Sequence, residues 1–268
     1  MSLAGLLATL EPLGGFEARV YAEKDRVYKV YAPKERHLAW LEAQNLARAG
    51  HGAMVLKVEE VEGHGLLVLR RFPGQPFSRE AFTPTLLGAL SAYFQALHRL
   101  PEPGKVEEEA LLARLEGFLE VLHDLPEARG LLEALKKEVK RVAGLERAFC
   151  HRDPWAGNVL VRAEGAGEPV FLVDWARAGG DDPARDLAIL KTGSLDLLGE
   201  ASGEALARLV RSYPRSAEVW ARLRFWVPLT YLHDLVWFRT KAREGFAQAV
   251  AEKLPLALRF FRDPPALW

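Results

Sequence analysis

The first third of the chain alternates apolar and polar positions with the period of β-strands. Residues 18–24 and 25–33 place β-branched and aromatic side chains around charged turn residues, which is typical of a hairpin. Residues 54–63 and 64–72 have the same character. Between these two pairs, residues 34–50 carry apolar side chains at helical spacing and end at a glycine. This part of the pattern therefore predicts four strands and one helix.

The apolar positions of the remaining chain mostly follow helical spacing. Residues 83–100 predict an amphipathic helix entered through Thr-Pro, and two further helices are predicted over 106–122 and 126–142. Short apolar runs between residues 149 and 173 interrupt this pattern and predict a small embedded hairpin. Helical spacing resumes after Asp186 and continues to the C-terminus.

The stretch FPGQPFSRE, which begins at Phe72, separates the two patterns and has the prolines and glycine of a linker. We therefore expect an α+β fold with two lobes. Residues 1–76 are expected to form a small β-rich N-terminal lobe, with the linker at about residues 70–77. Residues 77–268 are expected to form a larger, mostly helical C-terminal lobe.

Composition narrows the function classes. The 268 residues include 49% hydrophobic residues, enough for a substantial core, and the formal net charge is zero, which argues against a nucleic-acid partner. The single cysteine, Cys150, excludes an internal disulfide, and we interpret it as a small buried residue rather than a nucleophile. With no convincing signal peptide and no apolar run near ~18 residues, we expect a cytoplasmic protein without a membrane partner.

The segment HRDPWAGNVLV carries the strongest chemical pattern. Asp153 can orient and deprotonate a substrate hydroxyl, while the amide oxygen of Asn158 can complete the oxygen shell of magnesium. Asp174 ends the apolar run VFLV, which is a rigid mount for a second metal-binding carboxylate. A turn decorated with Asp and Asn is common, but the three residues in this order favour the handling of magnesium-bound phosphates.

A second set of candidates lies in the N-terminal lobe. Lys29 lies inside the strand-like run VYKVY, so its ammonium group needs a partner, and Glu42 on the following helix is the best candidate. Glu35 could instead favour the helix dipole, and Lys29 could be a solvated edge-strand lysine. Gly14 and Gly15 precede the first hairpin and could let backbone amides approach phosphate oxygens, although a simple tight turn explains them nearly as well.

The acidic stretch GGDDPARDLA is expected to support the HRD segment. Asp186 precedes a helix-like run and could hydrogen-bond the backbone of that loop, where His151 also belongs to the supporting residues. Asp181 and Asp182 could cap the helix or contact substrate at the rim.

A third set lies near residue 230. Trp226, Thr230, His233, Asp234 and Trp237 recur at three- and four-residue spacing, on one stripe of a helix if Pro228 lies in its first turn. Among them, Trp226, Asp234 and Trp237 could bind an amine or a sugar. The alternative is that the aromatic residues are core and that Asp234 pairs with Arg239 or Arg243.

These motifs together resemble the aminoglycoside phosphotransferase and choline kinase family, the small-molecule branch of the protein-kinase-like fold. The resemblance is carried by HRDPWAGNVLV, VDWARAGGDDPARDLA, VYKVY, LLVLRRFPG and ALHRLP, in order over most of the chain. It implies ATP-dependent transfer of the γ-phosphoryl group to a small-molecule hydroxyl.

In that resemblance Asp153 would act as base, and Asn158 and Asp174 as magnesium ligands. Lys29 and Glu42 would act on the nucleotide phosphates, and the linker near Leu69 to Phe72 would receive the adenine.

Departures from the motifs of protein kinases disfavour one alternative function. Trp-Ala follows Asp174 where protein kinases have Phe-Gly, and only a short stretch separates Asp174 from Asp186, which disfavours a protein kinase. HRDPWAGN also resembles the ketosamine kinases, which carry a tryptophan at the same place. The remaining alternative is a non-catalytic nucleotide-binding, pseudokinase-like module. The acceptor, the choice of ATP or GTP, and the oligomeric state are left open.

Overall fold

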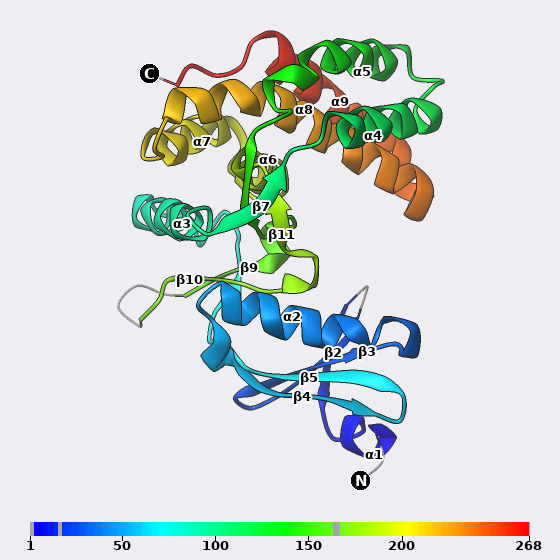
Figure 1. Cartoon of the computed structure of the whole chain (residues 1–268), viewed down its shortest axis with the longest axis vertical. Helices are drawn as coiled ribbons and strands as arrows, with labels where there is room; N and C mark the ends of the chain where they lie inside the picture. Colours follow the sequence, from blue (N-terminus) through cyan, green and yellow to red (C-terminus); the bar gives the residue numbers. More distant parts are fainter. Residues whose placement is uncertain (1–2, 16–17, 163–166, 268) are drawn as a thin grey trace. The chain divides into compact units, whose positions relative to one another are not determined.

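The computed structural model describes residues 3–15, 18–162 and 167–267, which form two compact units (Figure 1). The first unit consists of Met1–Pro76 together with Asn158–Ala178. The second consists of Phe77–Gly157 together with Gly179–Trp268. The chain therefore enters the second unit just after Pro76, returns to the first at Asn158, and leaves it again after Ala178. The hairpin expected between residues 149 and 173 lies in the first unit rather than among the helices.

The first unit holds two sheets and one long helix. Its helices are α1 (Leu3–Leu7) and α2 (His37–Arg48), with 3-10 turns at Pro33–Glu35, Gly52–Met54 and Trp175–Arg177. Its strands are β1 (Glu11–Gly14), β2 (Ala18–Glu23), β3 (Arg26–Tyr31), β4 (Val55–Val61), β5 (His64–Arg70), β6 (Gln75–Pro76), β9 (Val159–Val161) and β10 (Val170–Leu172).

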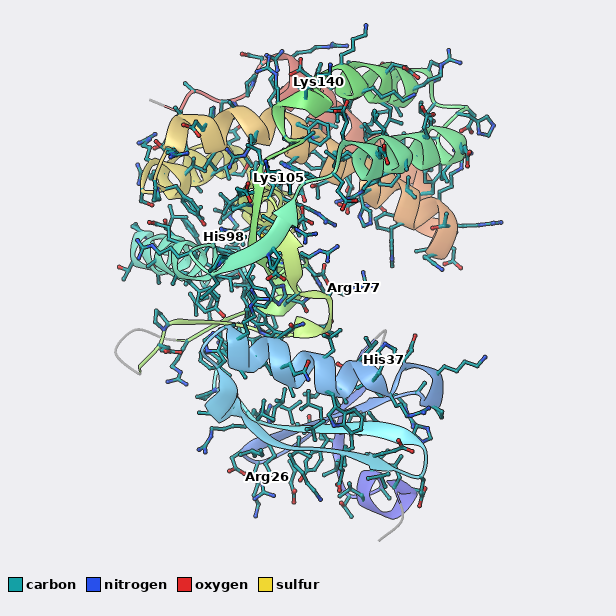
Figure 2. All side chains as sticks on the ribbon, in the orientation of Figure 1. Arg26, His37, His98, Lys105, Lys140 and Arg177 are labelled. Atoms are coloured by element: carbon teal, nitrogen blue, oxygen red, sulfur yellow. The ribbon has the colours of Figure 1, made fainter. Side chains whose placement is uncertain are left out.

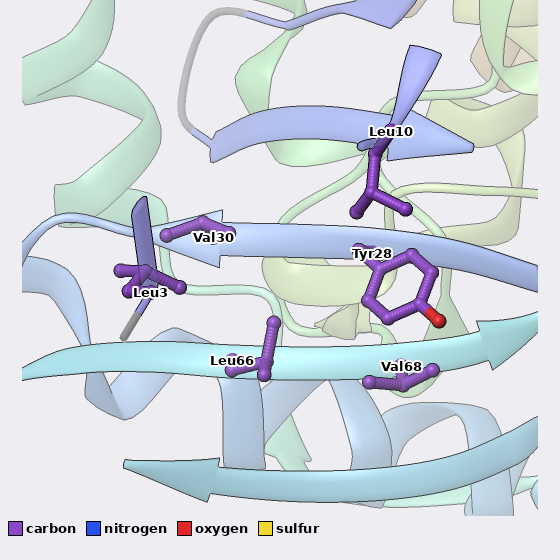
Figure 3. Packing of buried hydrophobic residues seen from close by; sticks show 6 residues of the cluster. All are labelled: Leu3, Leu10, Tyr28, Val30, Leu66 and Val68. Atoms are coloured by element: carbon purple, nitrogen blue, oxygen red, sulfur yellow. The ribbon is translucent and has the colours of Figure 1, made fainter. Parts of the chain in front are cut away.

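The main sheet of this unit is antiparallel, in the order β1-β2-β3-β5-β4, and a small sheet has the order β10-β9-β6. The predicted hairpins and the intervening helix are present, and helix α2 packs on β4 and β5 (Figure 1). Figure 3 shows the hydrophobic cluster on one face of the main sheet, formed by Leu3, Leu10, Tyr28, Val30, Leu66 and Val68.

Strand β3 contributes to the hydrophobic cluster with one face and contacts helix α2 with the other. Successive side chains of a strand point to opposite faces, so Tyr28 and Val30 enter the hydrophobic cluster while Lys29 and Tyr31 point the other way. On that other face Lys29 is 7% exposed and Tyr31 is fully buried. Both side chains contact Glu42 of α2, so the register of β3 places a lysine against a helix instead of in water.

The second unit is mostly helical. Its helices are α3 (Pro84–Leu97), α4 (Glu108–Val121), α5 (Pro126–Glu138), α6 (Pro183–Gly193), α7 (Ser202–Arg211), α8 (Ser216–Lys241) and α9 (Phe246–Arg262). Its strands are β7 (Pro101–Lys105), β8 (Glu146–Cys150) and β11 (Gly179–Asp181), in the order β11-β8-β7. Further 3-10 turns lie at Val139–Arg141, Leu195–Ala201 and Arg243–Gly245. Another, Ala156–Asn158, spans the point in the chain where the second unit ends and the first resumes.

Two helices of the second unit, α3 and α6, begin at side-chain caps. The Thr83 hydroxyl accepts the N–H of Leu86 at 3.1 Å at the start of α3, and Asp182 accepts the N–H of Ala184 at 3.0 Å at the start of α6. The capping role expected for the acidic stretch is therefore confirmed for Asp182. Within the described ranges, no helix combines the length and the apolar character needed to cross a membrane.

Helix α8 corrects one sequence-based expectation. The predicted stripe around residue 230 depended on Pro228 lying in the first turn of a helix, but α8 begins at Ser216 and continues through Pro228 to Lys241. Pro228 and its neighbours Val227 and Leu229 are buried, so packing stabilises the helix at a residue that lacks the N–H for an intrahelical hydrogen bond. Local propensity alone could not predict that continuation.

Candidate active site

Lys29 forms the centre of an ion-paired group in the first unit. Its Nζ lies 2.7 Å from Oε2 of Glu42 and 2.8 Å from Oδ1 of Asp174. The structure therefore contains the predicted pair of Lys29 and Glu42. Lys29 is not a solvated lysine on an edge strand, because β3 lies between β2 and β5 and the side chain is buried. Burial alone would lower the pKa of Lys29, but the charges of Glu42 and Asp174 and their hydrogen bonds outweigh it and raise this pKa.

Glu42 is fully buried and accepts more than one hydrogen bond. Besides the ammonium of Lys29, it receives the hydroxyl of Tyr31 on Oε2 and the backbone N–H of Trp175 at 3.1 Å on Oε1. These donors compensate the carboxylate for the hydrogen bonds to water that burial removes. Sequence reasoning missed Tyr31, although its position two residues after Lys29 on the same strand places both side chains on one face.

Asn158 and Asp174 lie at neighbouring strand ends. The carbonyl oxygen of Asn158 accepts the N–H of Val173 at 3.0 Å, which fixes the ends of β9 and β10 side by side. Asp174 follows Val173 directly and has φ 69° and ψ 60°, a left-handed conformation that costs of order 1–3 kcal/mol. Asn158 is 7% exposed, whereas the side chain of Asp174 is 36% exposed. A carboxylate and an amide oxygen at adjacent positions are donors that suit Mg²⁺.

Helix α2 also fixes the segment that follows Asp174. The side-chain amide of Asn45 donates to the carbonyl oxygens of Trp175 at 2.8 Å and Ala178 at 3.3 Å. Trp175 itself is fully buried, and its indole N–H donates to the carbonyl of Leu172 at 2.7 Å. Hydrogen bonds therefore fix the residues around Asp174, which suits a side chain that is a candidate for binding a metal ion.

Gly14 and Gly15 lie at the end of β1, with φ values of 93° and 121°. A Cβ at Gly15 would lie 2.1 Å from the carbonyl oxygen of Ala18, so only glycine fits there. The backbone geometry explains Gly15 as a turn residue, and its contact with phosphate stays a prediction.

The HRD segment lies in the second unit, directly after β8. Asp186 of α6 accepts the backbone N–H groups of His151 and Arg152, each at 2.7 Å, as the sequence suggested for this carboxylate. Arg152 has φ 70°, so the loop turns sharply before the half-buried Asp153. His151 is fully buried. Asp186 therefore fixes the backbone directly before Asp153 through these two hydrogen bonds.

A buried network continues from Asp186 to His98 and Tyr213. Figure 2 labels His98, which follows α3; its Nε2 lies 3.2 Å from Oδ2 of Asp186 and its Nδ1 lies 3.2 Å from the Tyr213 hydroxyl. Burial would raise the pKa of Asp186, but the hydrogen bond from His98 and the charges of His98 and His151 hold it below its usual range. Burial also raises the pKa of the Tyr213 hydroxyl, so Tyr213 keeps its proton in this contact with the His98 ring.

Cys150 completes this cluster without taking part in it chemically. Ligand atoms of His98, Cys150 and Asp186 lie within 4.8 Å of one another. Burial raises the pKa of the Cys150 thiol well above its usual value, with further contributions from the neighbouring aspartates. Both oxygens of Asp186 already accept hydrogen bonds from the protein. The cluster is therefore a hydrogen-bonded support for the loop, and the interpretation of Cys150 as a small buried residue agrees with its position.

The residues expected to bind substrate are only partly exposed. Trp226 is 2% exposed and its indole N–H donates to Asp182 at 2.8 Å, so it is a core residue, in agreement with the alternative interpretation of these aromatic residues. Asp234 pairs with Lys253 at 2.7 Å, not with Arg239 or Arg243. Trp237 is 38% exposed and is the one of the three with an open aromatic surface.

The structure thus divides the candidate residues between the two units. Lys29, Glu42, Asn158 and Asp174 lie in the first unit, together with Gly14 and Gly15. Asp153, His151 and Asp186 lie in the second, and the chain crosses between the units within the five residues that separate Asp153 from Asn158.

Several solved structures share the fold of this protein. A choline/ethanolamine kinase family protein from Mesorhizobium loti is 23% identical with a TM-score of 0.64, covering 95% of this chain and 88% of that one. For choline kinase LicA from Streptococcus pneumoniae these values are 15%, 0.64, 97% and 96%. For an aminoglycoside 2'-phosphotransferase-IIIa they are 14%, 0.67, 92% and 91%. The fold is the bilobal protein-kinase-like fold, as predicted, and the class is that of small-molecule kinases.

A match to a family model assigns the protein to its family. Residues 9–226 match the model of the phosphotransferase enzyme family (APH), and because this match spans most of the chain, the protein belongs to that family. No curated protein matches the chain closely enough to count as a relative. The resemblance stated from the motifs is confirmed.

Proposed function

We propose that this protein transfers the γ-phosphoryl group of ATP, with Mg²⁺, to a hydroxyl group of a small molecule. The observation that carries the proposal is the ion-paired group of the first unit, in which the Lys29 ammonium lies between the carboxylates of Glu42 and Asp174. A buried lysine with a raised pKa remains charged at neutral pH and can neutralise phosphate oxygens.

Nucleotide and metal would be held by the first unit. Asn158 and Asp174 supply the oxygen donors for Mg²⁺, which when bound neutralises charge on the phosphates. Lys29, positioned by Glu42, contacts the phosphates, and Gly14 and Gly15 let backbone amides approach them. Relatives of this fold have been solved with AMP and with GDP, which supports a nucleotide as the donor.

The acceptor hydroxyl would be activated in the second unit. Asp153 accepts the hydroxyl proton as phosphoryl transfer proceeds, and Asp186 acts as a positioning residue through the backbone N–H groups of His151 and Arg152. Because both supports are backbone hydrogen bonds to a fully buried carboxylate, the loop is preorganised before substrate binds.

The test is Asp153→Asn, which keeps the size of the side chain and removes its ability to accept the proton as a carboxylate. We expect nucleotide affinity to stay within about twofold and turnover to fall by about 10²–10⁴-fold, measured by ADP release with a panel of small alcohols. Wild-type turnover in this variant would rule out Asp153 as the base. Slow ATP hydrolysis without any acceptor in a broad screen would instead favour the non-catalytic nucleotide-binding module.

A further inference from the structure

Trp155 carries an exposed indole inside the HRD segment. It lies two residues after Asp153, and its backbone N–H donates to the carbonyl oxygen of Asp153 at 3.0 Å. The residue is 46% exposed. A single exposed apolar side chain is common on protein surfaces, so exposure by itself does not indicate a function. The surroundings of this indole give the stronger argument.

Two glycines leave room for the side chain of Trp155. A Cβ at Gly193, the last residue of α6, would lie 2.7 Å from Cβ of Trp155 and 3.1 Å from its Cα. A Cβ at Gly157 would lie 2.6 Å from both Cζ2 and Cζ3 of the indole. Neither glycine has a positive φ, so their backbone conformations do not require glycine. The space that Trp155 occupies requires it, and the indole therefore lies in a defined place.

The stretch that packs on the indole has balanced charges. Ser194, directly after Gly193, is buried and its hydroxyl donates to the carbonyl oxygen of Pro154 at 3.4 Å. The charged residues nearest to Gly193 along the chain are Lys191 and Asp196, and these two pair with each other. Residues 191–196 therefore offer no unpaired carboxylate to a cationic acceptor.

The indole of Trp155 offers two kinds of contact to a ligand. Its face can pack on C–H groups or on a cation, and its N–H is a hydrogen-bond donor. Within the described residues, this N–H has no hydrogen-bond partner. A ring-form sugar matches both groups, because it has an apolar C–H face and hydroxyl oxygens at its edge. A quaternary ammonium such as choline would use the face alone.

We propose that Trp155 binds the acceptor by stacking on the ring of a sugar and donating its indole N–H to a sugar oxygen. The proposal rests on the kinase function proposed above and specifies the acceptor of that site as a ring-form sugar. Because Trp155 and Asp153 belong to one hydrogen-bonded turn, a sugar on the indole lies beside the residue proposed as the base. A stacked ring has few orientations, so it presents its hydroxyl in a reproducible position.

The binding test compares D-glucose and D-ribose with their open-chain alditols, sorbitol and ribitol, and then a broader panel of such pairs. Saturation-transfer NMR on the whole chain, with ADP and Mg²⁺ present, should detect ring C–H protons of a sugar more strongly than those of its alditol. Trp155→Leu should weaken the affinity for that sugar by about fivefold to fiftyfold. Leu56→Ala, which removes a 42% exposed side chain from β4, is the control and should bind like the wild type.

Gly157→Ala tests the same contact without changing the indole. The added methyl group displaces the ring, so sugar affinity should fall in the wild-type background and should not fall further in Trp155→Leu. Equal losses in both backgrounds would overturn the proposal, as would unchanged sugar affinity in Trp155→Leu or an equal loss in Leu56→Ala. If Trp155→Leu failed to fold, Trp155→Phe would take its place, because phenylalanine has a smaller face and no N–H, and unchanged affinity there would overturn the proposal.

The activity test uses the same compounds with choline added, assayed by ADP release. Preferred transfer to ring-form sugars, with a KM for the sugar that rises in Trp155→Leu while the KM for ATP does not, supports the proposal. Equal or better transfer to the alditols or to choline overturns it. Transfer to no compound would contradict the kinase function, and the NMR measurement would then decide on Trp155 by itself, with no bound sugar in the panel counting against the proposal.

Discussion

The hydroxyl of Tyr31 donates a hydrogen bond to Oε2 of Glu42, the carboxylate that also pairs with Lys29. Tyr31 and Lys29 lie two residues apart on β3 and approach Glu42 from the same face of the sheet. The strand therefore positions the glutamate as well as the lysine. A residue outside the recognisable motif contributes in this way to the geometry of the ion-paired group around Lys29.

Tyr31→Phe should separate this positioning role from simple packing. The ring volume is conserved, so the loss is confined to a hydrogen bond onto a buried carboxylate, and unfolding free energy should fall by about 1.5–3 kcal/mol. We expect the KM for ATP to rise more than kcat falls. Thermal unfolding and steady-state kinetics check both values, and an unchanged KM with lowered stability would limit Tyr31 to a structural role.

Asp186→Asn should destabilise the protein in a pH-dependent manner. Asparagine has one acceptor oxygen where Asp186 uses two, so at neutral pH we expect a loss of about 2 kcal/mol or more. The pKa of Asp186 is held low in the folded state, so its contribution is complete above the unfolded value near ~4 and is lost as pH falls through the folded value.

The stability difference between wild type and Asp186→Asn should accordingly shrink on acidification. Chemical unfolding at neutral pH and at about pH 3 measures this difference. A constant difference over that range would mean that the charge of Asp186 is not what the fold depends on.

Asp174→Asn should weaken the effect of magnesium on nucleotide binding. Asparagine keeps one oxygen ligand and removes the negative charge, so ATP affinity in Mg²⁺ should fall by at least about tenfold. In EDTA the wild type and the variant should bind ATP alike. Calorimetry in both buffers is the measurement, and an equal loss in EDTA would show that the variant disturbs Lys29 instead of the metal site.

Trp226→Phe tests the reassignment of this residue to the core. It removes the indole N–H that Asp182 accepts, while Arg222 still pairs with that carboxylate. We expect stability to fall by about 1–3 kcal/mol with the acceptor KM unchanged. A large rise in the acceptor KM with normal stability would restore the substrate contact that the sequence suggested.

Asp234→Ala tests the remaining acidic candidate in α8. Its pair with Lys253 is partly exposed, so the change in unfolding free energy should stay within about 1 kcal/mol. The acceptor KM should not change, because Asp234 is already neutralised. Lys253→Ala is the control, and a rise in the acceptor KM in Asp234→Ala alone would identify Asp234 as a substrate contact.

Much of this molecule could be predicted because its signals are local. The alternation of apolar and polar residues around Lys29 predicts both the hairpin and the face of the strand that Lys29 occupies. The apolar run before Asp174 predicts the strand whose end carries this carboxylate. The pairing of Lys29 with Glu42 followed from the cost of burying an unpartnered ammonium.

Other features could not be predicted because they depend on partners distant in sequence. The spacing of Trp226 and Asp234 is equally suited to a core stripe and to a binding stripe, and only packing against Asp182 and Lys253 distinguishes them. His98 ends a helix with no local sign that it contacts Asp186, which lies 88 residues further along. Continuation of α8 through Pro228 likewise depends on burial by the surrounding helices.

Cys150 gives this protein an internal chemical probe. It is the single thiol of the chain, is fully buried on β8, and directly precedes the HRD segment. A maleimide can react with it only after that region opens, so the labelling rate would report the free energy of local opening without any engineered substitution. Comparing that rate with and without nucleotide would measure how strongly nucleotide binding restrains the HRD segment.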